Sequence, residues 1–335
     1  MKNQQIQLAA RPVGEIKPTD FTLVDTDLPS PGEGEVLVEI HYLAVEPAMK
    51  GWIEARVDYV KPVEIGELMR GSGSGVVIES NHPDFPVGTR VAGSFGWQRY
   101  IVTDGRGAVA LRKIPDGIGE TAALNVLGIT GLTAYFGMGE IGEPKAGDTV
   151  LVSGAAGATG SVAGQLARIA GARVIGIAGG KDKCDWLVNE LGFDGAIDYK
   201  NEDTEARVKA LCPDGVDVYF DNTGGMILGA ALFRMNIGGR IACCGVVSQY
   251  DTDRPEPGPK GVPGLLVNKR LTMRGFLLFD FADRYEQARD EIHGWLNSGQ
   301  LRALTDEVSG LDAAPAAFVD LLQGGNIGTR VVRLD

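Results

Sequence analysis

Cysteine and histidine are scarce in this chain of 335 residues, which contains four cysteines and three histidines. The cysteines form no CxxC pair, which predicts reduced thiols in a cytoplasmic protein rather than a disulfide framework. No apolar run approaches the length of a membrane span, and the opening residues lack the apolar core of a signal peptide. Basic residues are in the minority, because the formal net charge is −12. This charge argues against nucleic acid or an anionic membrane surface as the partner.

Residues 1–120 hold few ligands for a transition metal, because they contain no cysteine and only His41 and His82. His41 falls in an expected strand and His82 in an expected turn, so each is more easily explained as a structural or exposed residue. His293 lies in an expected helix with nothing nearby to pair with it. Because the catalytic zinc of an alcohol dehydrogenase of similar layout needs Cys and His ligands from the β-rich part, we expect no metal.

Glycine, in contrast, is plentiful, and one glycine-rich stretch, TVLVSGAAGATG at residues 149–160, organises the chain. Residues 149–153 form an apolar run that predicts a buried strand, and residues 161–170 have the pattern of an amphipathic helix. Residues 173–178 predict the next strand of a βαβ unit. Any α/β protein can use glycine at such a turn, but the strand, the spacing and the helix agree here. We therefore expect a dinucleotide pyrophosphate at the start of this helix.

The rest of the chain divides into a β-rich part, residues 1 to about 120, and a later part in which strands and helices alternate. The alternation predicts an α/β fold with a parallel, doubly wound sheet. Between the two parts, Thr121 is the expected cap of one helix that runs through Tyr135. The strand candidates of the later part are residues 148–153, 173–178, 195–199, 216–221, 240–245 and 270–276, and the main helix candidates are residues 161–170, 181–191, 204–211, 226–235 and 281–296.

The end of the second strand predicts which dinucleotide binds. NAD-binding folds place a carboxylate about 20 residues beyond the glycines, where it binds a ribose hydroxyl. Here that position is Gly180, followed by Lys181, Asp182 and Lys183. A small, neutral strand end flanked by lysines favours a 2′-phosphate and therefore NADP(H). The alternative is that these lysines are solvated residues in the first turn of a helix.

Several segments together resemble the zinc-independent medium-chain dehydrogenases/reductases over nearly the whole chain. The similarity is greatest to the NADPH-dependent alkenal/one reductases, a group that includes prostaglandin reductase (leukotriene hydroxydehydrogenase) and bacterial curcumin reductase. The matching segments are VEPAMK at residues 45–50, ESNHPD at 79–84, GITGLTAY at 128–135, AGGKDK at 178–183, LGFD at 191–194, YFDNTGG at 219–225, CGVVSQY at 244–250 and GGNIGT at 324–329.

The resemblance implies a GroES-like, β-rich catalytic domain, residues 1–124 and 294–335, and a Rossmann NADP(H)-binding domain, residues 125–293. It implies reduction of the C=C bond of an α,β-unsaturated ketone or aldehyde by hydride transfer without metal. Relatives also suggest a homodimer. The chain departs from the family pattern at Ala48, where many relatives have Tyr, at Lys50, where Arg is usual, and at Thr329, where Lys is common.

Residue by residue, the resemblance places Lys183 and Tyr199 near the 2′-phosphate, Asn222 near the nicotinamide ribose and Asn326 near the nicotinamide. The full set of expected cofactor-binding residues is Gly157, Ala158, Thr159, Gly160, Gly180, Lys183, Tyr199, Asn222, Cys244, Gly245, Tyr250, Phe276 and Asn326.

Reduction of an enone needs a donor at the oxygen on which charge develops. Tyr250 is the first candidate and Tyr59 the second, because a phenol donates a hydrogen bond while neutral. Either residue could instead pack against the wall of the site, and solvent or a cofactor hydroxyl could supply the proton. Two other functions stay open: an NADPH quinone reductase, and a non-catalytic NADP(H)-binding sensor.

Overall fold

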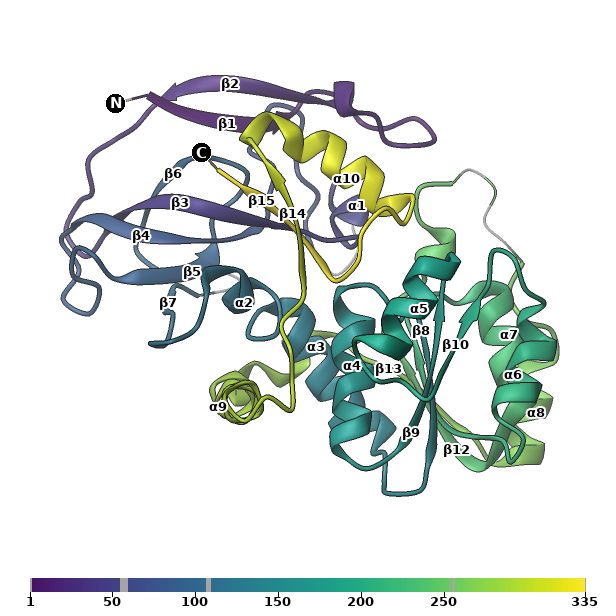
Figure 1. Ribbon diagram of the computed structural model, residues 1–335. Coiled ribbons are helices and arrows are strands. Elements are labelled where there is room, and N and C mark those ends of the chain that lie inside the picture. Colours follow the sequence, from purple (N-terminus) through teal and green to yellow (C-terminus); the bar gives the residue numbers. More distant parts are fainter. Residues whose placement is uncertain (1, 55–59, 107–109, 253, 255–256, 335) are drawn as a thin grey trace. The chain divides into compact units, whose positions relative to one another are not determined.

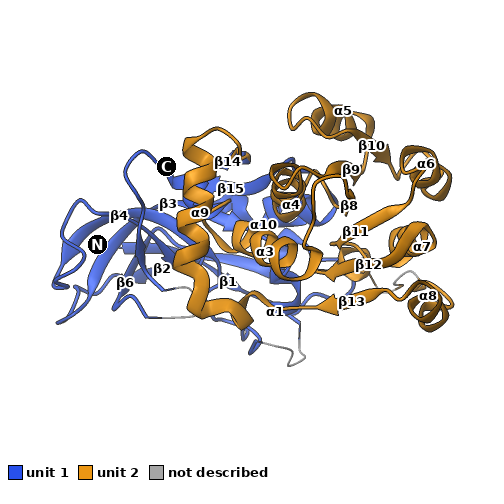
Figure 2. Cartoon of the chain, turned by 90° about the horizontal axis from the view of Figure 1, so that it is seen from below, with its two compact units in different colours: residues 1–125, 305–335 blue, residues 126–304 orange. Residues whose placement is uncertain are grey.

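The computed structural model describes residues 2–54, 60–106, 110–252, 254 and 257–334. The chain forms two compact units, one of residues 1–125 and 305–335 and one of residues 126–304 (Figure 2). Each unit has its own sheets (Figure 1). None of the helices in the described ranges is long and apolar enough to cross a bilayer.

The first unit is mostly β-structure, with a seven-stranded sheet and a separate antiparallel pair, β1 and β2. The order along the larger sheet is β14-β15-β3-β4-β5-β7, and β6 pairs with β3. The strands are β1 (Lys2–Leu8), β2 (Phe21–Asp27), β3 (Val36–Val45), β4 (Ser72–Ser80), β5 (Arg90–Ser94), β6 (Tyr100–Thr103), β7 (Arg112–Lys113), β14 (Thr305–Ser309) and β15 (Thr329–Arg333); the helices are α1 (Met49–Trp52), α2 (Glu120–Leu124) and α10 (Ala314–Leu322).

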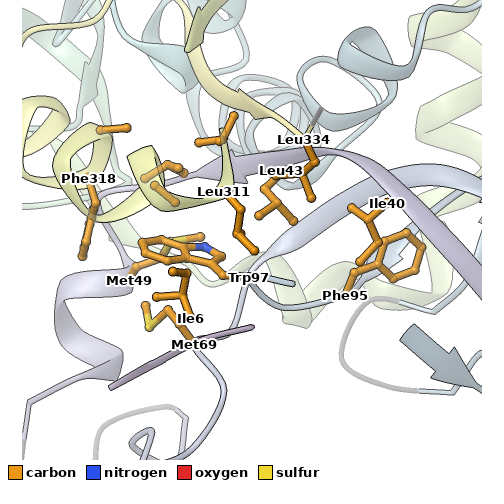
Figure 3. Close-up of a cluster of buried hydrophobic side chains, with 14 of the residues drawn as sticks. Ile6, Ile40, Leu43, Met49, Met69, Phe95, Trp97, Leu311, Phe318 and Leu334 are labelled. Atoms are coloured by element: carbon orange, nitrogen blue, oxygen red, sulfur yellow. The ribbon is translucent and has the colours of Figure 1, made fainter. Parts of the chain in front are cut away.

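Three aromatic rings from distant parts of the sequence meet in the core of the first unit. The ring of Trp97 lies 5.6 Å from that of Phe21 and 6.0 Å from that of Phe318, the latter edge to face. Met49 and Met69 belong to the same buried cluster (Figure 3). Because Phe318 lies on α10, this cluster holds the C-terminal segment in the first unit.

The second unit contains a six-stranded parallel sheet in the order β10-β9-β8-β11-β12-β13. Helices α3 and α4 lie on one side of these strands and α6, α7 and α8 on the other (Figure 2). The strands are β8 (Thr149–Ser153), β9 (Arg173–Ala178), β10 (Gly195–Asp198), β11 (Val216–Asp221), β12 (Met235–Cys243) and β13 (Thr272–Gly275); the helices are α3 (Ile129–Gly137), α4 (Ala158–Ile169), α5 (Lys181–Asn189), α6 (Thr204–Leu211), α7 (Gly225–Arg234), α8 (Val262–Lys269) and α9 (Tyr285–Asn297).

This sheet confirms the predicted doubly wound α/β fold. The chain leaves β8 in one direction to form β9 and β10, and returns on the other side of β8 to form β11, β12 and β13. The order therefore reverses between β8 and β11. Open α/β sheets bind ligands at the carboxyl ends of their strands, next to such a reversal.

The prediction of a single helix from Thr121 through Tyr135 is wrong, because the structure has two helices there, α2 and α3. α2 ends at Leu124, and the backbone of Asn125 leaves the helical region with φ −84° and ψ −97°. The side chain of Asn125 donates a hydrogen bond of 2.6 Å to Oγ1 of Thr329 on β15. The break at Asn125 coincides with the boundary between the two units.

The chain returns to the first unit at Thr305, whereas the family resemblance implies a return at residue 294. Contacts between α9 and α3 explain why the whole of α9 belongs to the second unit. The hydroxyl of Tyr135 donates to Oε2 of Glu291 at 2.8 Å, and its ring lies 6.1 Å from that of Trp295. Burial and this hydrogen bond raise the pKa of Tyr135 to about 12.

A buried carboxyl follows β3 in the first unit. Glu46 is only 5% exposed, and its Oε1 has no hydrogen-bond partner among the described residues. Removal from water disfavours the charged form, so burial raises the pKa of Glu46 from 4.5 to about 7. The folded protein therefore keeps a proton on Glu46 at pH values where the unfolded chain has lost it.

α4 packs closely against the ring of Phe193 at Gly164, a position without a side chain. A Cβ on Gly164 would lie 2.0 Å from Cζ of the buried Phe193 ring, far inside van der Waals contact. Replacing Gly164 with Ala must displace this ring, and overpacking of this kind costs roughly 1–3 kcal/mol. We expect Gly164→Ala to lower the free energy of unfolding in urea by this amount.

Gly294 in α9 provides a matched control, because a Cβ there would meet nothing within 4 Å. Gly294→Ala should leave stability unchanged or raise it by up to about 1 kcal/mol, since Ala favours the helix. Equal effects of the two substitutions would show that the contact between α4 and Phe193 is not tight.

Glu46 predicts how stability depends on pH. Because its pKa is higher in the folded state, the free energy of unfolding should fall as the pH rises between the unfolded value of 4.5 and the folded value of about 7. The full shift corresponds to about 3 kcal/mol. Glu46→Gln should remove this part of the fall, measured by urea unfolding across the window. Glu33→Gln, at an exposed carboxylate, is the control substitution.

Candidate functional site

The glycine turn after β8 presents backbone donors at the start of α4. Gly154 has φ 57°, and Gly157 is the extended N-cap of the helix. A Cβ on Gly160 would lie 2.3 Å from the carbonyl oxygen of Gly154, so no larger residue fits this turn. The first N–H groups of a helix, here those of Ala158, Thr159 and Gly160, have no partner within the helix. Together with the helix dipole they form a site for a phosphate group.

The helix begins three residues earlier than the sequence predicts, at Ala158 instead of Ser161. The extended backbone of Gly157 ends the turn, so that Ala158, Thr159 and Gly160 already belong to the first helical turn. Four of the expected cofactor-binding residues, Gly157 to Gly160, are thereby brought to one helix N-terminus.

The ends of β8 and β11 are joined through Ser153 and Asn222. The N–H of Asn222 donates to Oγ of Ser153 at 3.0 Å, and its side-chain Nδ2 donates to the Ser153 carbonyl at 2.7 Å. Because Nδ2 is engaged, the side chain of Asn222 is fixed with its amide oxygen as the remaining acceptor. An acceptor at the carboxyl end of β11 suits a hydroxyl group of a bound ribose.

The carboxylate of Asp221 stabilises this junction by accepting hydrogen bonds from four groups around it. Its Oδ1 accepts hydrogen bonds from the Tyr219 hydroxyl at 2.8 Å and from the N–H groups of Thr223 and Gly224 at 3.0 and 2.8 Å. The hydroxyl of Ser153 donates to the same oxygen at 3.3 Å. Burial, reinforced by the Asp221 charge, raises the pKa of Tyr219 well above its ordinary value, so Tyr219 stays a neutral donor.

The end of β12 joins the same edge of the sheet. The N–H groups of Cys244 and Gly245 donate to the carbonyl oxygen of Asp221 at 2.8 and 3.1 Å, and the N–H of Val247 donates to that of Asn222 at 3.1 Å. Burial raises the pKa of the Cys244 thiol to about 12, so this thiol stays protonated and is not a nucleophile. The expected cofactor residues Asn222, Cys244 and Gly245 are therefore neighbours.

Gly179 and Gly180 shape the end of β9. Gly180 has φ 101°, a backbone conformation that favours glycine, and its N–H donates to Oδ1 of Asp198 at 2.7 Å. Hydrogen bonds, first of all from the Asn201 side chain, lower the pKa of Asp198. The ring of Tyr199 lies 3.0 Å from the position that a Cβ on Gly179 would take.

Lys183 lies in the first turn of α5, whose N-cap is Gly180, and the N–H of Tyr199 donates to the carbonyl of Ala178 at 3.1 Å. The structure therefore gathers Gly180, Lys183 and Tyr199 at the end of β9. Lys200 is a further residue at this strand end, not among those expected from the sequence, and its Cε lies 2.9 Å from the same Cβ position on Gly179. Its approach to Gly179 depends on the pairing of β10 with β9, and no local motif marks it.

Tyr250 and Phe276 lie in the second unit, beyond the ends of β12 and β13. Tyr250 is half-buried and follows a short 3-10 helix, Val247–Gln249, to which its N–H donates. The ring of Phe276 packs on α3, with its Cζ 2.6 Å from the position of a Cβ on Gly137. Tyr59, the second catalytic candidate, lies outside the described residues.

Asn326 belongs to the first unit, where it is buried and its Nδ2 donates to the Gly328 carbonyl at 2.7 Å. Thr329, the departure from the family pattern, is fully buried and accepts the hydrogen bond from Asn125. A lysine at this buried position would need space and a counter-ion. The threonine is therefore integrated into the start of β15 as a structural residue.

Among the described residues, no group of three or more His, Cys, Asp or Glu side chains could hold a metal ion. Nδ1 of His41 lies 3.0 Å from Oε2 of Glu120, and this contact raises the pKa of His41. Nδ1 of His82 accepts the N–H of Asp84 at 3.1 Å. The absence of a metal stays a prediction.

Comparison with known proteins identifies the family. Residues 4–111 match the family described as "N-terminal domain of oxidoreductase", and residues 158–294 match the one described as "Zinc-binding dehydrogenase". The NADPH-dependent curcumin reductase of Escherichia coli (strain K12) is 37% identical over 99% of this chain and 97% of its own length. Prostaglandin reductase 1 of Mus musculus is 39% identical over 94% and 95%. The chain belongs to the medium-chain dehydrogenase/reductase family.

Solved structures agree with this assignment. CurA from Vibrio vulnificus superimposes on this medium-chain dehydrogenase/reductase with a TM-score of 0.91 at 41% identity, covering 99% of both chains. The structure of CurA in complex with NADPH gives a TM-score of 0.92 at 40% identity, also over 99% of both chains. The predicted fold class and family are thus confirmed.

The junction between β8 and β11 generates a prediction for Ser153, which is fully buried. Ser153→Ala removes the acceptor of the Asn222 N–H and one donor to Asp221, which should cost about 1–3 kcal/mol of unfolding free energy. Ser161→Ala in α4 is the control, because the Ser161 hydroxyl only donates a hydrogen bond to the carbonyl of Ala158 within the same helix. Urea unfolding of both variants decides: equal losses would show that Ser153 does not join the strands.

Proposed function

We propose that this medium-chain dehydrogenase/reductase uses NADPH to reduce the C=C bond of α,β-unsaturated ketones or aldehydes. The proposal is supported by relatives named NADPH-dependent curcumin reductase, prostaglandin reductase 1 and, at 38% identity over 99% of this chain in Nicotiana tabacum, 2-alkenal reductase (NADP(+)-dependent). The observation that carries it is the carboxyl edge of the parallel sheet. There a glycine turn with helix N–H groups stands beside the end of β9, where Gly180 takes the position of the ribose-binding carboxylate of NAD-binding folds and Lys183 follows in the first turn of α5.

The residues at this edge fit NADPH. The N–H groups of Ala158, Thr159 and Gly160 would hold the pyrophosphate, and the amide oxygen of Asn222 would accept a ribose hydroxyl. Lys183 and Tyr199 would contact the 2′-phosphate. When bound, NADPH supplies the hydride, so the protein's task is to bind and orient the substrate and to stabilise developing charge.

Tyr250 is the proposed donor to the substrate oxygen. The 3-10 helix before it is fixed to the β11 end, because the N–H groups of Val247 and Ser248 donate to the carbonyls of Asn222 and Thr223 at 3.1 Å. The same turn that holds Asn222 therefore also positions the backbone leading to Tyr250. A neutral hydroxyl there can donate to an oxygen that gains negative charge.

Quinone reduction is the second candidate, favoured by one solved structure. The quinone oxidoreductase of Pseudomonas syringae pv. Tomato DC3000 superimposes with a TM-score of 0.77 at 25% identity. The identity to the curcumin and prostaglandin reductases is higher, so we place enone reduction first. The homodimer and the cytoplasmic location stay predictions.

A substrate panel tests the proposal. Oxidation of NADPH is followed at about 340 nm with an enone, an alkenal and a quinone, and the product is checked for a saturated C–C bond. We expect the enone and alkenal to be reduced. Faster turnover of the quinone with no enone reduction would establish the second candidate. If the protein binds NADPH but no substrate causes its oxidation, the result would favour the non-catalytic NADP(H)-binding sensor.

Tyr250→Phe removes the proposed donor and should lower kcat on the enone by about 10²-fold, because such donors act mainly on the transition state. The dissociation constant of NADPH should change little. Tyr100→Phe is the control, since its hydroxyl contacts Glu39 in the first unit. Wild-type kcat in Tyr250→Phe would remove Tyr250 from the mechanism.

A further inference from the structure

The turn at the end of β9 is crossed by two side chains from the end of β10. A Cβ on Gly179 would lie 2.9 Å from Cε of Lys200 and 3.0 and 3.1 Å from Cε1 and the hydroxyl of Tyr199. Both side chains therefore run directly over the α-carbon of Gly179. A larger residue at position 179 would crowd this crossing, which brings Lys200 to the strand end where Gly180 and Lys183 lie.

The backbone of Lys200 is held in place by Asp198. The Lys200 N–H donates to Oδ1 of Asp198 at 3.1 Å, and the same carboxylate accepts the N–H of Gly180 at 2.7 Å and the Asn201 side chain at 2.7 Å. Asp198 thus ties the ends of β9 and β10 together. The ammonium group of Lys200 has no hydrogen-bond or ion-pair partner among the described residues.

The charge at this strand end favours a second cation. A phosphate monoester carries about −1.5 to −2 charges at neutral pH, more than one lysine neutralises. The N–H of Gly180 is already engaged by Asp198, whose own carboxylate adds negative charge nearby. Lys181 is exposed and pairs with Asp185 on its own helix. Lys200, whose ammonium group has no partner among the described residues, therefore remains to face a phosphate beside Lys183 in the first turn of α5.

We propose that Lys200, admitted by Gly179, is a second cationic determinant of the 2′-phosphate site and helps this protein to choose NADPH over NADH. The inference rests on the proposed function, because it assigns a residue to the cofactor site of that reaction. Tyr199 and Lys200 both pack over the end of β9. The ring of Tyr199 covers Gly179, and the aliphatic part of the Lys200 side chain passes over Gly179 so that its ammonium group reaches the proposed site. The 2′-phosphate then lies between ammonium groups from α5 and from the segment after β10.

Binding of two nucleotides to the full chain tests this assignment without any turnover. Adenosine 2′,5′-bisphosphate carries the 2′-phosphate, and adenosine 5′-monophosphate lacks it. Measured by titration calorimetry, Lys200→Gln should weaken the bisphosphate about tenfold, as expected for loss of a charge-assisted contact, and leave the monophosphate unchanged. Lys200→Arg should retain most of the affinity, since the positive charge remains.

Lys181→Gln is the matched control, because it removes one positive charge from the same helix end but from a residue paired with Asp185. It should change both affinities by less than about twofold, as exposed ion pairs contribute little. Gly179→Ala should weaken the bisphosphate by no more than Lys200→Gln does, because the new Cβ crowds Cε of Lys200 and the ring of Tyr199 while the ammonium charge remains.

An unchanged preference for the bisphosphate in Lys200→Gln, or equal weakening in Lys181→Gln, would overturn the role of Lys200 and leave the NADPH proposal intact. A wild-type protein that binds both nucleotides equally would instead contradict the NADPH proposal itself. Circular dichroism and urea unfolding of each variant establish that the fold is retained.

Discussion

The carboxylate of Asp221 lies at the end of β11, almost entirely removed from solvent, and one of its oxygens gathers donors from Ser153, Tyr219, Thr223 and Gly224. A buried charge is tolerated only when hydrogen bonds compensate its lost hydration, so these groups are held where they are. The turn after β11 and the end of β8 consequently have one arrangement. The position of Asn222, of the glycine turn and of the backbone that leads to Tyr250 follows from it.

Glycines shape this edge of the sheet as strongly as the polar side chains do, because they leave room where a Cβ would collide or allow a positive φ. Gly160 allows α4 to begin against the carbonyl of Gly154, and Gly179 allows Tyr199 and Lys200 to cross the end of β9. At Gly180 the reason is conformational, since φ is 101°. Two neighbouring glycines thus serve different physical needs, and a substitution at either would disturb the adenosine end of the proposed cofactor site by a different route.

Much of the second unit could be predicted because its signals are local. Apolar runs predicted β9 and β11 with the bounds that the structure has, and the helix Thr204–Leu211 likewise. Errors arose where a distant contact decides. α2 and α3 are separate helices, at a break where Asn125 bonds to Thr329 on β15, and α9 stays with the second unit through Tyr135. In these two hydrogen bonds the partners are 204 and 156 residues apart in the sequence, so a local periodic pattern contains no sign of the contact.

The sequence by itself determined the βαβ unit, the neutral end of β9 and the family resemblance, because each is encoded in consecutive residues. Only the tertiary structure decided the junction of Ser153 with Asp221 and Asn222, the burial of Glu46 and the approach of Lys200 to Gly179. Parallel strands that are neighbours in the sheet can be far apart along the chain. Side chains at their ends meet through the pairing of strands, and this pairing is a property of the whole domain.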